Sequence, residues 1–321
     1  TAVVVVLGVD KGIEKASKVM MPVLFILIVG ISVYSLTLKH TDENGVTRTA
    51  FEGLKIYLVP NFEGITLSRF VTIALDAMGQ MFYSMSLAMG IMITYGSYCR
   101  KDSNLVKSVN QIEIFDTGVA LFAGLIMIPT VFAFQGEAGL TQAGPGLMFK
   151  ALPAIFEQMG TMGPIVGALF FILVLFAALT SSISLMETVA SVFIDRFKMS
   201  RLKAAGVTFL IAMIMGVAVC FGYNIFYFEA TLPNGAIGQQ ILDILDYISN
   251  SILLPIVALL TCVLIGWVAK PEYVTDEVKQ GLGNGKFRRE KLYVIMIKYV
   301  APILLFLIFL QAFNVFGFLS A

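Results

Sequence analysis

Seven long apolar stretches recur along this chain, and they restrict its fold more than any other feature. A helix needs about 20 consecutive apolar residues to cross a bilayer, and each stretch reaches that length. The predicted membrane-spanning helices lie at about 17–37, 68–99, 110–134, 161–195, 204–228, 239–268 and 293–319. In lipid every backbone polar group needs a partner within the protein. The sequence therefore predicts an all-α polytopic membrane protein, with residues 1–321 in a single transmembrane domain.

Composition supports lipid as the surrounding medium. Hydrophobic residues make up 58% of the chain and charged residues only 13%, whereas a soluble domain has about 25% charged residues. An excess of this size cannot be buried in a soluble core. The net charge of +1 gives no sign of a nucleic-acid partner, and none is predicted; the oligomeric state is left open.

Loops rich in Lys and Arg alternate along the chain with loops that hold few of them, and this pattern indicates how the chain is oriented in the membrane. The rich segments lie around 10–18, 100–107, 196–203 and 270–298. Loops rich in Lys and Arg remain on the cytoplasmic side of a membrane. We therefore expect a multi-pass protein of the plasma membrane, with Ala321 on the extracellular side.

Two segments fall on the predicted outer side. Residues 38–66 read as a long polar loop, and residues 136–160 begin with glycines and a proline. The stretch 147–159 within the second segment is too short to span. We predict that 136–160 forms an extracellular cap over the outer vestibule, and a surface hairpin without a gating role is the open alternative.

Polar side chains near the middle of a membrane are costly, so they are candidates for function. Four clusters meet this description: Gln80, Tyr83, Ser84 and Ser86; Asp116; Thr180, Ser181, Ser182 and Ser184; and Asp243, Asp246 and Tyr247. Each also has a structural explanation, because helix hydroxyls bond to carbonyls of the preceding turn and small residues permit close helix packing.

The third cluster has a spacing that suits a cation. The carbonyl of Ala177 and the hydroxyls of Thr180 and Ser181 are three and four residues apart, hence on one helix face. Uncharged oxygens of this kind suit a small monovalent cation if a second helix supplies further oxygens. The spacing alone does not identify that helix.

An enzyme is the function class that the sequence supports least. His40 is the only histidine, so no other position can belong to a His-based triad or metal site. No nucleophile–base pair, carboxylate pair or metal-ligand cluster shares a depth in the predicted membrane. We predict that the chain is not an enzyme.

Four stretches resemble the bacterial neurotransmitter:sodium symporters. They are residues 8–22 (GVDKGIEKASKVMMP), 79–98 (GQMFYSMSLAMGIMITYGSY), 145–156 (PGLMFKALPAIF) and 176–187 (FAALTSSISLME). The similarity covers the whole chain, from the end of the family's fourth transmembrane helix through its eleventh. Helices one to three and most of the fourth are missing from this correspondence, so we expect that these 321 residues alone do not transport.

The resemblance implies an inverted-repeat transporter fold with discontinuous helices, including a break near 84–88. It also implies sodium-coupled symport of a hydrophobic amino acid, with aromatic ones among the candidates, by alternating access. The implied substrate-binding positions are Tyr83, Ser86, Met89 and Leu185. The implied sodium ligands are Ser84 and Asp116 at a first site and Ala177, Thr180 and Ser181 at a second. Asp246 matches the outer-gate acid, and Gly12 and Pro22 match a hinge in the fifth helix.

Three positions depart from the family pattern. Asp116 stands where Asn is common, and Ala120 replaces a Ser or Glu associated with chloride or its substitute. We hypothesise that the charge of Asp116 makes chloride unnecessary, so that Na⁺ is the only ion required. Met89 replaces a bulkier aromatic residue, and because methionine is flexible we expect a pocket for large apolar side chains.

Two other functions remain open from the sequence. A proton-coupled transporter of the same fold would use Asp116 or Glu187 as its proton carrier. A membrane sensor would bind an amino acid without accumulating it. Replacement of sodium separates the first alternative from symport, and the absence of accumulation identifies the second.

Overall fold

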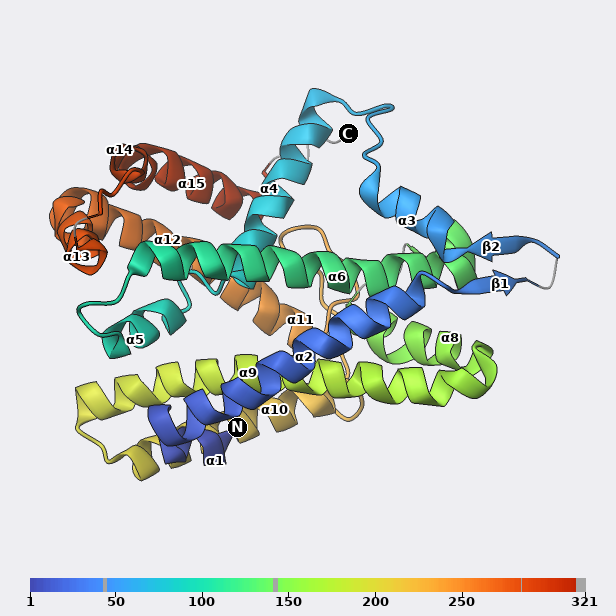
Figure 1. Cartoon of the computed structure of the whole chain (residues 1–321), viewed down its shortest axis with the longest axis horizontal. Coiled ribbons are helices and arrows are strands. Elements are labelled where there is room, and N and C mark those ends of the chain that lie inside the picture. Colours follow the sequence, from blue (N-terminus) through green and yellow to red (C-terminus); the bar gives the residue numbers. More distant parts are fainter. Residues whose placement is uncertain (43–44, 141–143, 284, 316–321) are drawn as a thin grey trace. The chain divides into compact units, whose positions relative to one another are not determined.

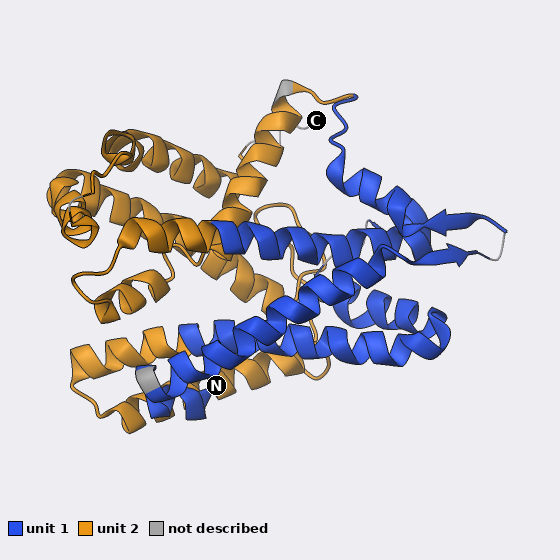
Figure 2. Ribbon diagram, viewed as in Figure 1, with its two compact units in different colours: residues 1–63, 114–184 blue, residues 64–113, 185–321 orange. Residues whose placement is uncertain are grey.

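The computed structural model describes residues 1–42, 45–140, 144–283 and 285–315, most of them in helices (Figure 1). They group into two compact units, residues 1–63 with 114–184 and residues 64–113 with 185–321 (Figure 2). Two long helices, α6 (Leu105–Gly139) and α9 (Gly163–Phe197), each contribute residues to both units.

Unit 1 contains several short elements besides its parts of α6 and α9. They are α1 (Ala2–Leu7), the π-helical turn η1 (Val9–Ile13), α2 (Glu14–Ser35), the antiparallel strands β1 (Lys39–Thr41) and β2 (Thr47–Thr49), α3 (Ala50–Leu58), α7 (Gly144–Gly146), η2 (Leu147–Ala151), α8 (Leu152–Gln158) and the 3-10 turn η3 (Gly160–Met162).

The segment 38–66 is more ordered than the polar loop that its composition indicates. It holds the β1–β2 hairpin, in which His40 pairs with Arg48, and helix α3. Thr49 and Glu52 form a reciprocal capping box that starts α3, and this T-x-x-E pattern is visible in the sequence. The hairpin packs on α6, because the ring of His40 stacks on Phe134 with centroids 4.7 Å apart.

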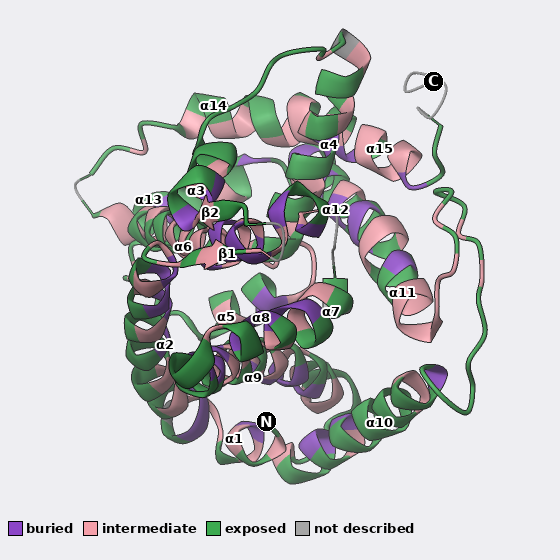
Figure 3. Ribbon diagram, turned by 90° about the vertical axis from the view of Figure 1, so that its right-hand side faces the viewer, coloured by how far each residue is buried: buried purple, intermediate pink, exposed green. Residues whose placement is uncertain are grey.

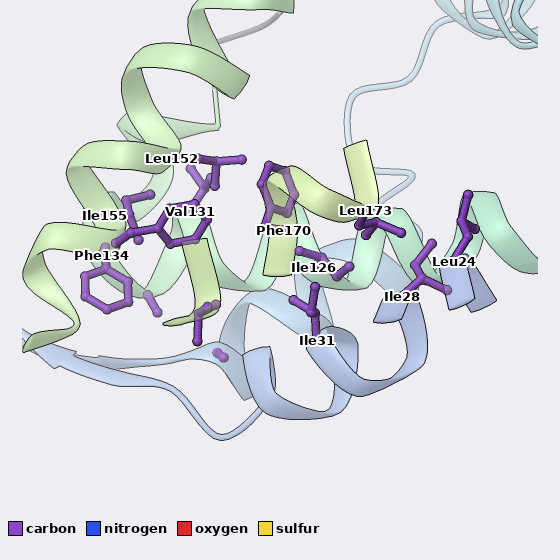
Figure 4. Packing of buried hydrophobic residues seen from close by; sticks show 14 residues of the cluster. Leu24, Ile28, Ile31, Ile126, Val131, Phe134, Leu152, Ile155, Phe170 and Leu173 are labelled. Atoms are coloured by element: carbon purple, nitrogen blue, oxygen red, sulfur yellow. The ribbon is translucent and has the colours of Figure 1, made fainter. Parts of the chain in front are cut away.

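The core of unit 1 lies where α2, α6, α8 and α9 meet (Figure 4). Its buried side chains are aliphatic or aromatic, so close packing of apolar groups, and not hydrogen bonding, stabilises this core. They include Leu24, Ile28 and Ile31 of α2, Ile126, Val131 and Phe134 of α6, Leu152 and Ile155 of α8, and Phe170 and Leu173 of α9.

Unit 2 contains the remaining helices. They are α4 (Leu67–Ser84), α5 (Ile91–Tyr98), α10 (Arg201–Gly222), α11 (Ile241–Asp246), η4 (Tyr247–Leu253), α12 (Leu254–Val263), η5 (Leu264–Val268), α13 (Glu272–Leu282), α14 (Glu290–Ile295), η6 (Met296–Val300) and α15 (Ala301–Gln311).

Within the described residues, six helical segments are long and apolar enough to cross a membrane. They are Lys11–Ser35, Leu105–Gly139, Gly160–Phe197, Arg201–Gly222, Ile241–Val268 and Glu290–Gln311. Most of α10 is exposed (Figure 3), as expected for a helix in lipid. The predicted stretch 68–99 is divided between α4 and α5. Residues 141–143 of the predicted cap, residues 316–319 of the last predicted span, and Ala321 lie outside the described residues.

Candidate functional site

A break separates α4 from α5 in unit 2. Helix α4 ends at Ser84 and α5 begins at Ile91. Between them Ser86 (φ 54°), Ala88 (φ 60°) and Gly90 (φ 79°) adopt left-handed conformations. For residues other than glycine this costs about 1–2 kcal/mol each, so the surrounding structure must impose it. The discontinuous helix expected from the sequence is therefore present.

The break places the C-terminal end of α4 next to the N-terminal end of α5. Three carbonyl groups in the last turn of α4 accept hydrogen bonds from the backbone N–H groups of residues 85–87, whereas the first turn of α5 has N–H groups without helical acceptors. The corresponding partial charges are negative at the end of α4 and positive at the start of α5. Such a pair of helix ends suits a ligand that carries both a cation and an anion.

A cavity of about 590 Å³ adjoins the break within unit 2. Tyr83, Met89 and Leu185, three of the four residues expected to bind substrate, line it together. The fourth, Ser86, lies in the break but is not part of the cavity wall. Most of the remaining wall is apolar, with Met215 of α10 and leucines of α11, η4 and α12. The cavity therefore suits an apolar group of substantial size.

Asp246, the expected gate residue, lines this cavity and a neighbouring one of about 580 Å³. Asn250 donates a 2.5 Å hydrogen bond to its carboxylate. The second cavity is more polar, and there Gln311 donates a 2.5 Å hydrogen bond to Asp76. Asn250 and Gln311 were not predicted. For Asn250, the i, i+4 spacing from Asp246 is the one sequence feature that could have indicated the contact. Gln311 comes from a helix far away in the sequence, so no such feature exists for it.

The expected cation site on α9 lies in unit 1. Thr180 Oγ1 donates a 2.8 Å hydrogen bond to the carbonyl of Ala177. A hydrogen bond of this kind, from a helix hydroxyl to a carbonyl of the preceding turn, is the structural explanation that the sequence offers for such polar clusters. Both oxygens keep lone pairs, and Ala177 and Ser181 are exposed. These uncharged oxygens fit Na⁺, which prefers oxygen ligands. Of the other expected ligands, Asp116 belongs to unit 1 and Ser84 to unit 2.

Of the expected hinge residues, Gly12 lies in η1 and Pro22 in the first half of α2. A Cβ atom at Gly12 would come within 2.0 Å of the Val4 carbonyl oxygen, so only glycine fits there. Pro22 lies inside α2 and cannot donate to the carbonyl of Lys18, one turn earlier. The helix is nevertheless continuous from Glu14 in this structure.

A buried acid lies in the second half of α9. Glu187 is fully buried and accepts hydrogen bonds from Tyr98 (2.8 Å) and Arg201 (2.5 Å). Its carboxylate is therefore balanced by a guanidinium. The sequence singled out Glu187 only as a possible proton carrier and did not predict either partner.

Comparisons with known proteins agree with this arrangement. Residues 1–319 match the sodium:neurotransmitter symporter family. The sodium-dependent transporter YhdH of Bacillus subtilis is 33% identical over 99% of this chain and 65% of its own length. A sodium-dependent transporter of Haemophilus influenzae is 32% identical over 95% of this chain and 61% of its own.

Among solved structures, MhsT in complex with L-phenylalanine is similar, with a TM-score of 0.79 and 34% identity over 97% of this chain and 65% of that one. The chain thus spans less than two thirds of the length of each of these relatives. The likeness confirms the expected polytopic transporter fold with discontinuous helices. Matched along nearly its whole length, the chain belongs to the sodium:neurotransmitter symporter family.

Proposed function

We propose that this protein carries out sodium-coupled symport of hydrophobic amino acids, including aromatic ones, by alternating access. The observation that carries the proposal is the apolar cavity beside the helix break, on which Tyr83, Met89 and Leu185 meet. A related structure has L-phenylalanine bound, and an aromatic side chain is compatible with a cavity of about 590 Å³.

The break and the cavity divide the recognition of an amino acid between them. The α-ammonium and α-carboxylate groups interact with the helix ends and with Ser86, where backbone dipoles of both signs are available. The side chain enters the cavity, where burial of apolar surface favours binding by about 25 cal/mol per Å². Substrates with larger apolar side chains therefore bind more tightly until the cavity is full.

Sodium ions complete the transport cycle in this proposal. Ser84 and Asp116 contribute to one site, and Ala177, Thr180 and Ser181 contribute to the other. Asp246 closes the outer side over bound substrate. Unwinding of the segment between Gly12 and Pro22 then admits water from the inside, since Pro22 already lacks one helical hydrogen bond.

Uptake by the complete protein in proteoliposomes tests the proposal. Radiolabelled leucine and tryptophan are supplied with and without an inward sodium gradient. We expect accumulation only with the gradient, and loss of it in a Thr180→Ala/Ser181→Ala double variant. Accumulation that ignores sodium contradicts coupling, and binding without accumulation favours a sensor.

Chloride is not required in this proposal, because Asp116 supplies the negative charge near the first sodium site. Replacement of chloride by gluconate should leave uptake unchanged. An Asp116→Asn variant should lose uptake in gluconate and regain part of it in chloride. A strict chloride requirement in the unmodified protein would refute this role of Asp116.

The geometry disfavours one proton carrier of the alternative mechanism. Protonation of Glu187 would break its buried ion pair with Arg201, and truncating or neutralising one partner of such a pair is costly. Asp116 remains the other candidate carrier. Uptake that persists without sodium and follows the proton gradient would support it.

A further inference from the structure

The only tryptophan of the chain lies at the end of a candidate membrane span in unit 2. Trp267 is in η5, next to the last residue of the span Ile241–Val268. Its side chain is 58% exposed, and its ring meets that of Tyr299 edge to face with centroids 5.9 Å apart. Tyr299 belongs to η6 and is 56% exposed. Two large aromatic rings thus remain uncovered side by side.

A lysine lies at the same level as these rings. A Cβ atom at Gly266 would be 3.2 Å from the carbonyl oxygen of Ile297 and 3.5 Å from both Cα and Cγ of Lys298. The two helices are therefore in close contact, and the aliphatic stem of Lys298 passes over Gly266. Trp267, Lys298 and Tyr299 together form what we call the aromatic ledge.

The polar atoms of the ledge are not used by the protein. Within the described part of the chain, Lys298 has no ion pair, and neither the indole N–H of Trp267 nor the hydroxyl of Tyr299 has a hydrogen-bond partner. Lys279 differs in this respect. It donates a 2.6 Å hydrogen bond to Glu290, which raises the pKa of Lys279.

The composition of the ledge matches the headgroup region of a bilayer. Tryptophan and tyrosine concentrate there because each has an apolar body and a polar edge. Lys298 is eight residues after the start of its own span but contacts Gly266 at the end of the span Ile241–Val268, and a lysine there extends its ammonium group toward lipid phosphates while its stem stays in apolar surroundings. The loop that precedes α14 adds positive charge through Lys286 and Arg288, and such loops attract anionic lipids.

We propose that the aromatic ledge binds the headgroup of an anionic phospholipid. The ammonium of Lys298 pairs with the lipid phosphate, and the indole N–H and the tyrosine hydroxyl donate hydrogen bonds to it or to the ester carbonyls below. An anionic headgroup is preferred to a zwitterionic one, because no cation of the lipid itself competes with Lys298. The site belongs to the basic side of the spans and is separate from both cavities.

Fluorescence of Trp267 tests the proposal directly. The protein is placed in bilayers of phosphatidylglycerol and phosphatidylcholine in which one lipid or the other carries bromine near the top of its acyl chains. Trp267→Phe supplies the background emission. We expect brominated phosphatidylglycerol to quench the Trp267 signal as if enriched about five-fold over its bulk fraction.

Two variants separate a local site from general attraction. Lys298→Gln should abolish the enrichment, so that both brominated lipids quench in proportion to their amounts. Lys291 is another lysine two turns earlier in the same span, and Lys291→Gln should retain most of the enrichment. Equal quenching by both lipids in the unmodified protein, or equal loss in the two variants, overturns the proposal. Absence of quenching by either lipid also overturns it, since protein would then cover the ledge.

Discussion

At the scale of single residues, the size of the substrate cavity depends on a few side chains at its wall. Leu185 of α9 is one of them. Its side chain is 47% exposed and borders the cavity, so a larger side chain there extends into the cavity and reduces the space for substrate, and overfilling that space costs about 1–3 kcal/mol. This position should therefore control which substrates fit.

We expect Leu185→Phe to lower tryptophan uptake by about ten-fold and leucine uptake much less. Competition assays in proteoliposomes measure the two effects. Leu175→Phe is the matched control, since Leu175 lies on the same helix, is exposed and is not part of the cavity wall. An equal loss for both substrates in Leu185→Phe would count against a role in selecting by size.

Glu187 is a second residue whose surroundings fix the consequence of a change. Its two hydrogen bonds come from Tyr98 and Arg201, and it is fully buried. Arg201→Met leaves the carboxylate without its cation and should destabilise the protein by about 3 kcal/mol. Adding Glu187→Gln should recover much of this loss. Thermal unfolding of the single and double variants in detergent measures the coupling, and strictly additive losses would disprove it.

At the scale of elements, α2 and α6 are joined by a hydroxyl that compensates for a proline. Pro129 cannot donate to the carbonyl of Leu125, which is one turn earlier in α6. Ser35 of α2 is buried, and its hydroxyl shares its proton between that carbonyl at 2.9 Å and the Ser32 carbonyl in its own helix at 2.8 Å. The Leu125 carbonyl, which Pro129 leaves without a helical donor, thus accepts a hydrogen bond from the neighbouring helix. Apolar surroundings require such a partner.

A double-mutant cycle tests this compensation. Ser35→Ala should lower stability by about 1–2 kcal/mol. In a Pro129→Ala background the backbone N–H returns, so the same Ser35→Ala change should cost almost nothing. Ser32→Ala is the control, because Ser32 reaches the Phe122 carbonyl, whose helical donor is intact. Urea or thermal unfolding provides the values, and a Ser35 effect independent of residue 129 would contradict the interpretation.

At the scale of the whole molecule, the sequence predicts those features that follow from hydropathy and from family motifs. The polytopic helical fold and the interrupted helix at Ser86 and Ala88 belong to this group. The strands β1 and β2 were missed because three-residue strands have no usable periodicity. Tyr83, a substrate-binding residue expected from the family resemblance, lines the cavity together with Met215, which was not predicted. Contacts between helices far apart in the sequence cannot be read from the sequence of either helix.

The pairing of Glu187 with Arg201 has a consequence for how the protein enters its membrane. A charged residue within a span opposes insertion, by about 2.5–3.5 kcal/mol at the centre and by less toward the ends. Glu187 lies ten residues before the end of α9, and Arg201 begins α10. During synthesis α9 would remain at the translocon until α10 has been synthesised, and the two helices would then insert into the membrane together as a hairpin. In a glycosylation-mapping assay, the insertion of α9 should improve when α10 follows, and Arg201→Met should remove that improvement.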